Sequence, residues 1–209
     1  GAAVKVLGGG IKRGAGESIH AVIWVSDLRG FTDMSDRLSG SDMLTLLNAY
    51  LEIMASAVLD NGGEVLKFVG DGILGVFPVR GLGGEKAAAA AALSAAHQAV
   101  AAMRLINLST PLELRDIAGW QPLRAGIALH EGEVFFGNIG SQGRLDFTVI
   151  GPVVNEACRV EALQKTLGRD ILLTEAVARY LDGPLDRLGE HHLRGVAAPM
   201  SIFSPSETL

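Results

Sequence analysis

Two aspartates stand at the ends of apolar runs, and this pattern limits the possible folds more than any other feature of the chain. Asp27 follows the run 21–26, and Asp71 lies between two glycines that separate the runs 64–69 and 73–77. Short apolar runs bounded by such residues are typical of buried or half-buried strands. A carboxylate at the edge of an apolar sheet needs a partner, because charges are rarely buried unpaired.

If the two strands are neighbours in the sheet, Asp27 and Asp71 lie next to each other, and each has only the other carboxylate as its partner. At about 4 Å, two carboxylates would repel by roughly 4 kcal/mol at an effective dielectric constant of about 20. A cation removes this cost, and hard oxygen ligands select magnesium or manganese. The pattern therefore predicts a divalent cation between Asp27 and Asp71.

Composition indicates one globular domain. The chain has 209 residues, of which 48% are hydrophobic, so it can bury one substantial core. The formal net charge is -5 and no basic block is present, which argues against nucleic acid or an anionic membrane as a partner. The single cysteine, Cys158, cannot form a disulfide within the chain and matches a reducing, cytoplasmic compartment.

Periodicity and turn residues predict the order of elements in the first half of the chain. We expect a linker or tail at 1–18, a strand at 20–26, a short helix ending near Gly40, a helix from Asp42 to Leu59 capped by Ser41, a hairpin of strands 64–69 and 73–77, a glycine-rich loop at 81–84 and an Ala-rich helix ending before Pro111. The uncharged stretch 87–103 is short for a membrane span, so we expect a soluble helix and no direct membrane contact.

The second half continues the alternation. We expect strands at 122–130 and 133–139 around His130-Glu131-Gly132, a short apolar segment at 147–150, a helix from Pro152 to Gly168, a strand at 171–173, a helix at 174–181, strands near 186–193 and 199–203, and a tail at 205–209. This order predicts an α+β, ferredoxin-like sandwich of the split βαβ, palm-like kind at 19–204, with helices packed on a mainly antiparallel sheet.

Spacing brings further polar residues together. Asn155 and Arg159 are four residues apart on the predicted helix and so share a face. Lys67 precedes Asp71 by four residues, which puts both on one side of an alternating strand. Taken singly, each has an ordinary explanation: a helix cap for Asp27, a turn residue for Asp71, and solvated polar positions for the others.

Three segments carry motifs in a fixed order. They are Val25-Ser26-Asp27-Leu28-Arg29-Gly30-Phe31-Thr32, then Lys67-Phe68-Val69-Gly70-Asp71-Gly72, then Phe147-Thr148-Val149-Ile150-Gly151-Pro152-Val153-Val154-Asn155-Glu156-Ala157-Cys158-Arg159. With the closing Leu193-Arg194-Gly195, the chain resembles the catalytic domain of class III nucleotidyl cyclases over about residues 20–204. A lone Gly-Asp-Gly would be a weak signal, but three motifs in order are a strong one.

The resemblance implies an adenylyl cyclase, which converts ATP to 3′,5′-cyclic AMP and pyrophosphate by attack of the ribose 3′-hydroxyl on the α-phosphate. Asp27, Asp71 and the backbone carbonyl of Leu28 would bind two divalent cations, Mg²⁺ or Mn²⁺. Lys67 and Thr148 would read the adenine. Guanylyl cyclases have glutamate at the lysine position, so Lys67 favours ATP.

The remaining roles concern the ribose and the phosphates. Asn155 would orient the ribose and Arg159 would stabilise the pentavalent phosphorus, while backbone N–H groups of Gly30, Phe31 and Thr32 would bind phosphate at a helix N-terminus. A lysine that often holds the triphosphate near the C-terminus is absent, with valine at 196. Arg144 is the first candidate to supply that charge and Arg194 the second.

In the family, the metal residues face the Asn–Arg helix across a head-to-tail dimer. Because this chain has both sets, the resemblance implies a homodimer with two shared sites. Thr148 matches the bacterial and soluble branch, some of whose members respond to bicarbonate, which makes bicarbonate a candidate activator. The alternatives are a guanylyl cyclase and a catalytically silent, cyclase-like dimerisation or regulatory domain. A diguanylate cyclase is rejected, because Gly83-Gly84-Glu85-Lys86 introduces a helix and is not in a strand hairpin.

Overall fold

The computed structural model describes residues 16–141 and 144–206, without the side chains of 139–147. One sheet organises this part of the chain, and its strands are β1 (Gly16–Leu28), β2 (Glu64–Val69), β3 (Gly72–Pro78), β4 (Ala125–Ser141), β5 (Arg144–Ile150), β6 (Ile171–Thr174), β7 (Leu185–His191) and β8 (Met200–Pro205). The order is β2-β3-β1-β4-β6-β8-β7, with β5 paired to β4. Only β4 and β6 pair in parallel among the described strands, so the predicted α+β fold with a mainly antiparallel sheet is confirmed.

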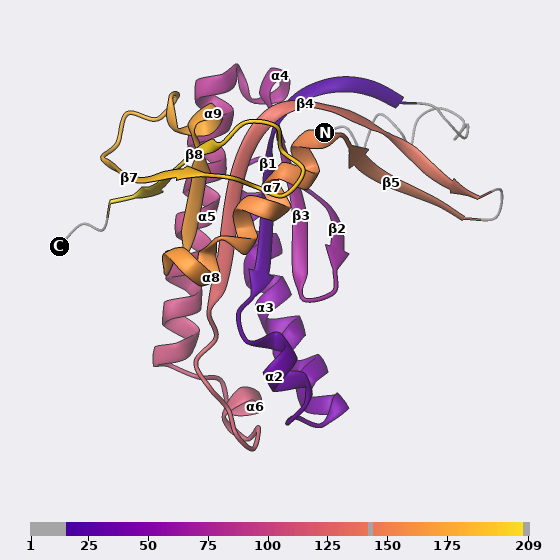
Figure 1. Ribbon diagram of the computed structural model, residues 1–209. Coiled ribbons are helices and arrows are strands. Elements are labelled where there is room, and N and C mark those ends of the chain that lie inside the picture. Colours follow the sequence, from indigo (N-terminus) through magenta and orange to yellow (C-terminus); the bar gives the residue numbers. More distant parts are fainter. Residues whose placement is uncertain (1–15, 142–143, 207–209) are drawn as a thin grey trace.

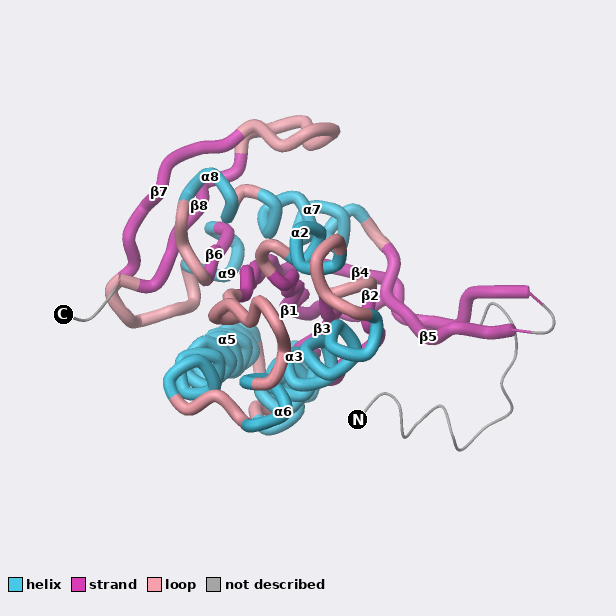
Figure 2. The backbone as a smooth tube through the Cα atoms, turned by 90° about the horizontal axis from the view of Figure 1, so that it is seen from below, coloured by secondary structure: helices cyan, strands magenta, loops and turns pink. Residues whose placement is uncertain are grey.

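Helices cover both faces of the sheet (Figures 1 and 2). The long helices α3 (Gly40–Asp60) and α5 (Glu85–Leu108) lie together on one face, and α7 (Pro152–Ala162) lies on the other. The short helices are α2 (Phe31–Ser35), α4 (Val79–Leu82), α6 (Leu112–Arg115), α8 (Gln164–Leu167) and α9 (Glu175–Ala178). Alternation along the central strand explains the two layers: Trp24 packs toward α3 and α5, whereas Ile23 packs in the cluster that includes Ala157 of α7.

By length and hydropathy, α3 and α5 would each suffice to cross a membrane. Both also contribute to the main core of the domain. Tyr50 and Met54 of α3 and a row of alanines of α5 are fully buried against the sheet. Small alanine side chains allow α5 to pack closely, so the core accounts for part of the apolar character of these helices, while a third of the apolar stretch of each helix is buried.

Several predicted boundaries are wrong. The first strand begins at Gly16, within the predicted tail, because 16–20 pair with β4. The N-cap of α3 is Ser39, whose hydroxyl accepts a hydrogen bond from the Asp42 N–H at 3.2 Å, and not Ser41. The 81–84 loop partly forms α4. The helix predicted over 152–168 divides at Leu163 into α7 and α8, and that predicted over 174–181 is only the single turn of α9.

The largest correction concerns His130-Glu131-Gly132, around which two separate strands were predicted. β4 runs through these residues without a break and pairs with β1 along its length. Glycine is required at this position for packing, because a Cβ on Gly132 would lie 2.7 Å from Cγ2 of Val153 in α7. Gly132 therefore permits close packing of a helix on the strand.

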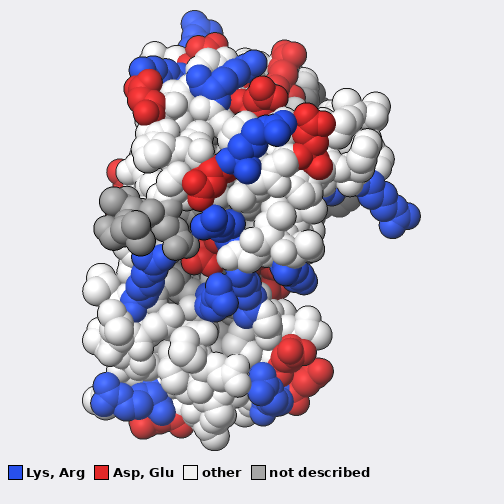
Figure 3. Space-filling model, turned by 60° about the vertical axis from the view of Figure 1, so that its left-hand side comes forward, with Lys and Arg blue, Asp and Glu red and all other residues white. Residues whose placement is uncertain are grey.

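Charge is distributed evenly on the visible surface. On the face in Figure 3, basic and acidic side chains are interspersed over most of the area. This mixture agrees with the composition of the chain, in which 18 Lys and Arg residues are set against 23 Asp and Glu residues.

Candidate active site

The two aspartates meet at one end of the central strands. β1 pairs antiparallel with β3, with Ser26 opposite Ile73, so Asp27 comes directly after the paired segment. Asp71 lies in the turn between β2 and β3, where Gly70 has φ 61°. A Cβ on Gly72 would collide with the Ser26 carbonyl oxygen, so this glycine allows the turn to approach β1. The predicted neighbourhood of Asp27 and Asp71 is thus present.

The side chains of Asp27 and Asp71 are within hydrogen-bonding reach of each other. Partial burial, followed by the hydrogen bond with Asp71 and its charge, raises the pKa of Asp27 to about 6. The ammonium of Lys165 and the Leu28 backbone oppose this shift. Paired hard oxygens that repel one another are a suitable binding site for Mg²⁺ or Mn²⁺.

A third carboxylate, which the sequence reasoning missed, lies beside the pair. Burial and the charge of Asp27 raise the pKa of Glu161 to about 7, with Lys165 and Arg29 acting in the opposite direction. In the described residues, no group of three His, Cys, Asp or Glu side chains is arranged to hold a metal ion. Glu161 therefore adds negative charge near the pair without completing a metal site. Its spacing of four residues from Lys165 was the available signal.

Arg29 connects the end of β1 to neighbouring segments of the chain. Its guanidinium lies 3.5 Å from Gln164 Oε1 and 3.6 Å from Asp170 Oδ1, and it donates to the carbonyl of Arg169. The backbone N–H of Arg29 donates to the Arg124 carbonyl at 2.8 Å. Arg29 thus ties β1 to the segment around 169–170, and its N–H is already used.

The turn that follows leads into α2. Gly30 precedes this helix with φ 76°, a conformation that favours glycine, and its carbonyl accepts from the Met34 N–H at 3.0 Å. The N–H groups of Phe31 and Thr32 belong to the first turn, where an α-helix offers no internal acceptor. This agrees with the predicted phosphate role of residues 30–32, which stays a prediction.

The two predicted base-reading residues lie on strands that contact each other although they are not neighbours in the sheet, β2 and β5. Lys67 is half-buried opposite Leu74, just after a register shift in β2. Thr148 is 5% exposed, and within the described chain its hydroxyl has no hydrogen-bond partner. Asp71 lies in the turn, so the alternation used to place it on the same face as Lys67 does not extend to it.

Asn155 and Arg159 share one side of α7, as predicted. Gly151 precedes this helix and Pro152 opens it, which suits the fixed φ of proline. Asn155 is exposed and Arg159 half-buried, and neither side chain makes a hydrogen bond or ion pair with the described residues. The Arg159 guanidinium lies against Gly195, where a Cβ would be 3.4 Å from an Nη atom.

The candidates for the missing triphosphate lysine have different environments. Val196 is half-buried and packs with Leu193 against the apolar cluster near the β8 strand. Arg194 is exposed. Arg144 is the first residue of β5, and its side chain lies outside the described residues.

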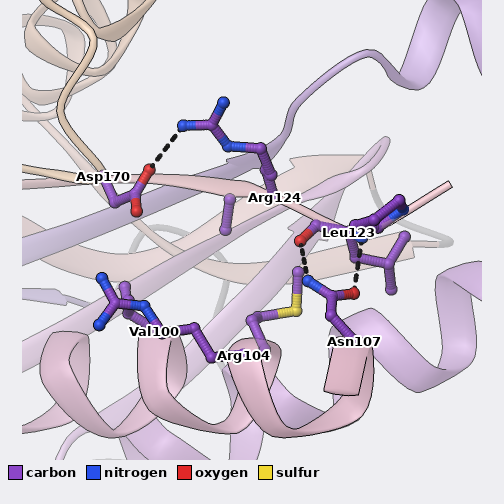
Figure 4. A pocket seen from close by; sticks show the side chains of 9 residues that line it. Val100, Arg104, Asn107, Leu123, Arg124 and Asp170 are labelled. Carbon is purple, nitrogen blue, oxygen red and sulfur yellow. Dashed lines mark hydrogen bonds and ion pairs between the residues drawn. The ribbon is translucent and has the colours of Figure 1, made fainter. Parts of the chain in front are cut away.

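A cavity of about 260 Å³ lies between the end of α5 and the start of β4 (Figure 4). Asn107 closes one end by a pair of 2.8 Å hydrogen bonds with the backbone of Leu123, and Arg124 lies 3.5 Å from Asp170. A second cavity, of about 660 Å³, lies between the start of β1 and α4. Neither of these cavities is lined by Asp27 or Asp71.

Comparison with known proteins assigns this arrangement to a family. The family model described as the adenylate and guanylate cyclase catalytic domain matches residues 16–204. An adenylate cyclase of Anabaena cylindrica is 34% identical over 174 residues, which is 83% of this chain and 33% of that protein. The photoactivated adenylate cyclase subunit alpha of Euglena gracilis is 30% identical over 82% of this chain and 16% of its own length.

Solved structures agree with this assignment. The adenylyl cyclase CyaB of P. aeruginosa superimposes with a TM-score of 0.82 at 26% identity, covering 93% of this chain and 97% of that one. The guanylyl cyclase Cya2 has a TM-score of 0.76 at 29% identity, covering 90% and 92%. The chain belongs to the adenylate and guanylate cyclase catalytic domain family, and its fold and sequence are those of a class III nucleotidyl cyclase. It spans a third or less of the length of these two curated relatives.

Proposed function

We propose that this domain is an adenylyl cyclase, which converts ATP to 3′,5′-cyclic AMP and pyrophosphate in a head-to-tail homodimer. The observation that carries the proposal is the Asp27–Asp71 pair, in which burial, followed by the hydrogen bond and charge of Asp71, raises the pKa of Asp27 to about 6. Such a pair gains most from a bound cation, and cyclisation of a nucleoside triphosphate needs positive charge at its phosphates.

The donor set suits two Mg²⁺ or Mn²⁺ ions, held by Asp27, Asp71 and the backbone carbonyl of Leu28. When bound, these ions supply charge that favours the ionised ribose 3′-hydroxyl and the departing pyrophosphate. The N–H groups of residues 30–32 hold phosphate oxygens at the start of α2.

Base selection depends on Lys67 and Thr148. The buried, unpartnered hydroxyl of Thr148 is the kind of group that a ligand satisfies, because an unpaired buried polar atom costs free energy. Lys67 donates to a ring nitrogen that accepts in adenine. The alternative, a guanylyl cyclase, has support from the similarity to Cya2, but lysine is a poor partner for the N–H groups of guanine.

The directions in which side chains leave α7 support a site divided between two chains. Glu161 faces the aspartate pair of its own chain. Arg159 precedes Glu161 by two residues, which places the two side chains about 160° apart around the helix. Asn155 and Arg159 therefore point away from their own chain's aspartates and are available to the nucleotide held by a second copy. There, Asn155 orients the ribose and Arg159 stabilises charge on the phosphorus.

A cyclase assay with ATP and GTP in parallel tests this proposal, with Mg²⁺ or Mn²⁺ and with or without bicarbonate. We expect cyclic AMP as the main product, and Lys67→Glu should reduce the ATP preference by about tenfold or more, since one good hydrogen-bonded contact contributes about 1.4 kcal/mol. Lys86→Glu is the matched control, because Lys86 is an exposed lysine paired with Asp182 far from the site. Absence of product under every condition would favour the silent domain, and an excess of cyclic GMP over cyclic AMP would favour the guanylyl cyclase.

A further inference from the structure

α7 lies on a strip of β4 in which most residues are small. Four alternate positions of β4 that face it are Gly126, Ala128, His130 and Gly132, and Val134 continues the strip under the start of the helix. A Cβ on Gly132 would meet Val153, and one on Gly126 would overlap the Gln164 side chain just beyond α7. The helix therefore runs opposite to β4, with its first turn over 132 and its end toward 126.

Apolar contact alone does not define the position of a helix on so smooth a surface. The contact between Ala128 and Val160 is of this kind, because it depends on buried area and has no preferred direction. A hydrogen bond does have a preferred direction and length. His130 is the one polar side chain among the four facing positions, and it makes such a bond to α7.

The contacts of His130 specify one tautomer. Nε2 lies 3.0 Å from Glu156 Oε2, and Nδ1 lies 2.8 Å from the Thr174 hydroxyl. An ionised Glu156 can only accept, so Nε2 carries the proton and Nδ1 accepts from Thr174. Burial lowers the pKa of His130, despite the opposing effect of Glu156, and so favours the neutral ring that this arrangement needs.

Glu156 is next to Asn155 and three residues before Arg159. Any slide or rotation of α7 that breaks the bond to His130 moves both of these residues. We propose that His130 is a positioning residue for cyclisation: through Glu156 it sets the register of α7 on β4 and hence the placement of Asn155 and Arg159 at the nucleotide. This proposal rests on the proposed function.

Kinetics of paired variants test the proposal. Glu156→Ala removes the acceptor from a side chain that is 23% exposed, whereas Glu156→Gln retains an acceptor oxygen. His130→Leu keeps the volume without the polar atoms. Because a misplacement of about 1 Å can cost about 100-fold, we expect Glu156→Ala and His130→Leu to lower kcat by about 10- to 100-fold. Lys67 and Thr148 lie on other elements, so KM for ATP should stay within about twofold.

Glu156→Gln should keep kcat within about threefold of the wild-type value, as a retained hydrogen bond requires. Val160→Ala is the stability control, since it removes buried methyl groups from the same helix without touching the hydrogen bond. It should lower the Tm but preserve kcat. Equal losses of kcat in Val160→Ala and Glu156→Ala would show that stability alone is responsible and would overturn the proposal.

Amide hydrogen exchange over residues 152–162 gives a readout that needs no activity. Exchange should be faster in Glu156→Ala and unchanged in Glu156→Gln. A result in which the wild-type domain forms no product while Glu156→Ala still exchanges faster than the wild type would refute the proposed function. It would leave intact the role of His130 in setting the register of α7. If Glu156→Ala has the same exchange rates and the same kcat as the wild type, the role of His130 itself is refuted.

Discussion

At the scale of single residues, the chemistry of the site is concentrated in carboxylates that are close together. Burial, followed by the hydrogen bond and charge of Asp71, raises the pKa of Asp27 to about 6, and Glu161 adds a third acidic group whose pKa is raised to about 7. Each group is held by backbone geometry that apolar contacts determine: a strand end, a tight turn and a packed helix. The resulting repulsion is stored in the metal-free protein and can be relieved by a cation or a proton.

The first prediction concerns stability. The pKa of Asp27 in the folded protein, about 6, lies above its ordinary value of 3.8, so protonation favours the folded state. The metal-free domain should therefore gain stability as the pH falls through 6 and lose it as the pH rises. In the presence of a chelator at about pH 7.5, Asp27→Asn should raise the free energy of unfolding by about 1 kcal/mol after discounting for solvent screening.

Thermal denaturation over a series from about pH 7.5 down to about pH 3.5 measures this effect, because the stabilisation by Asp27→Asn should shrink as the pH falls through 6 and vanish only below 3.8, where the carboxyl is protonated in the folded and the unfolded state alike. Asp186→Asn is a control, since Asp186 accepts from Arg169 and Ser206 at a distance from the pair, and its loss should destabilise. An unchanged or lower Tm of Asp27→Asn at the higher pH would contradict the account of the pair.

The second prediction concerns metal affinity. A proton on Asp27 competes with a cation, so the apparent affinity for Mn²⁺ should fall by up to about tenfold for each pH unit below about 6. Above about pH 7, Asp27 is ionised and should cause no further change in the affinity for Mn²⁺. Calorimetric titration with Mn²⁺ in buffers of different pH measures it. An affinity independent of pH between about 5 and 7 would show that Asp27 is not a ligand.

At the scale of elements, close packing of α7 on β4 joins the two functional parts of the chain. Gly126 lies opposite Asp27 in the β1–β4 register, and a Cβ there would overlap Gln164 Oε1. Gln164 is 1% exposed and donates to the carbonyl oxygens of Ile127 and Asp170. The side chain therefore cannot move aside without losing buried hydrogen bonds.

Gly126→Ala should for this reason destabilise the domain by about 1–3 kcal/mol, the cost of disrupting a buried polar group. The double variant Gly126→Ala with Gln164→Ala should recover part of the loss, because the collision disappears. Chemical denaturation of both variants measures the difference. Gly183→Ala is the matched control, since nothing lies within 4 Å of a Cβ at Gly183.

The elements themselves were largely predictable, because long periodic segments and glycine or proline boundaries depend on local physics. The β2–β3 hairpin and the Ala-rich helix α5 were placed within a few residues. The break between strands predicted near His130 was wrong because a glycine can either interrupt a strand or allow a neighbouring element to pack closely on it. Only the packing of Val153 shows that the second applies at Gly132. For the same reason the function of His130 was not visible, since Glu156 and Thr174 are 26 and 44 residues away.

At the scale of the whole molecule, the proposed site needs two chains. Helical geometry places Arg159 about 160° around α7 from Glu161, and the two cavities described above include neither Asp27 nor Asp71. Apolar side chains of β2 and of the β4–β5 pair are exposed, among them Phe68, Val69, Phe135 and Ile150. Exposed apolar surface of this kind is typical of a protein contact.

Mixing two inactive variants tests this division. Asp71→Ala and Asn155→Ala should each lose nearly all activity, and the mixture should recover up to about a quarter of the wild-type activity, because half of the dimers are mixed and each has one intact site. The specific activity of the wild-type domain should also fall on dilution. No recovery in the mixture, together with dilution-independent activity, would exclude a shared site.

The sequence by itself determined the family and the class of fold, and it nominated the residues for which chemical roles are proposed, because motif spacing and strand alternation are local properties of the chain. Only the tertiary structure decided which of these residues meet. It placed Asp27 against Asp71 through the β1–β3 pairing, added Glu161 from a distant helix, and anchored that helix through His130. Such contacts depend on strand order and on the depth to which side chains pack, and neither is written in the spacing of residues along one strand or helix.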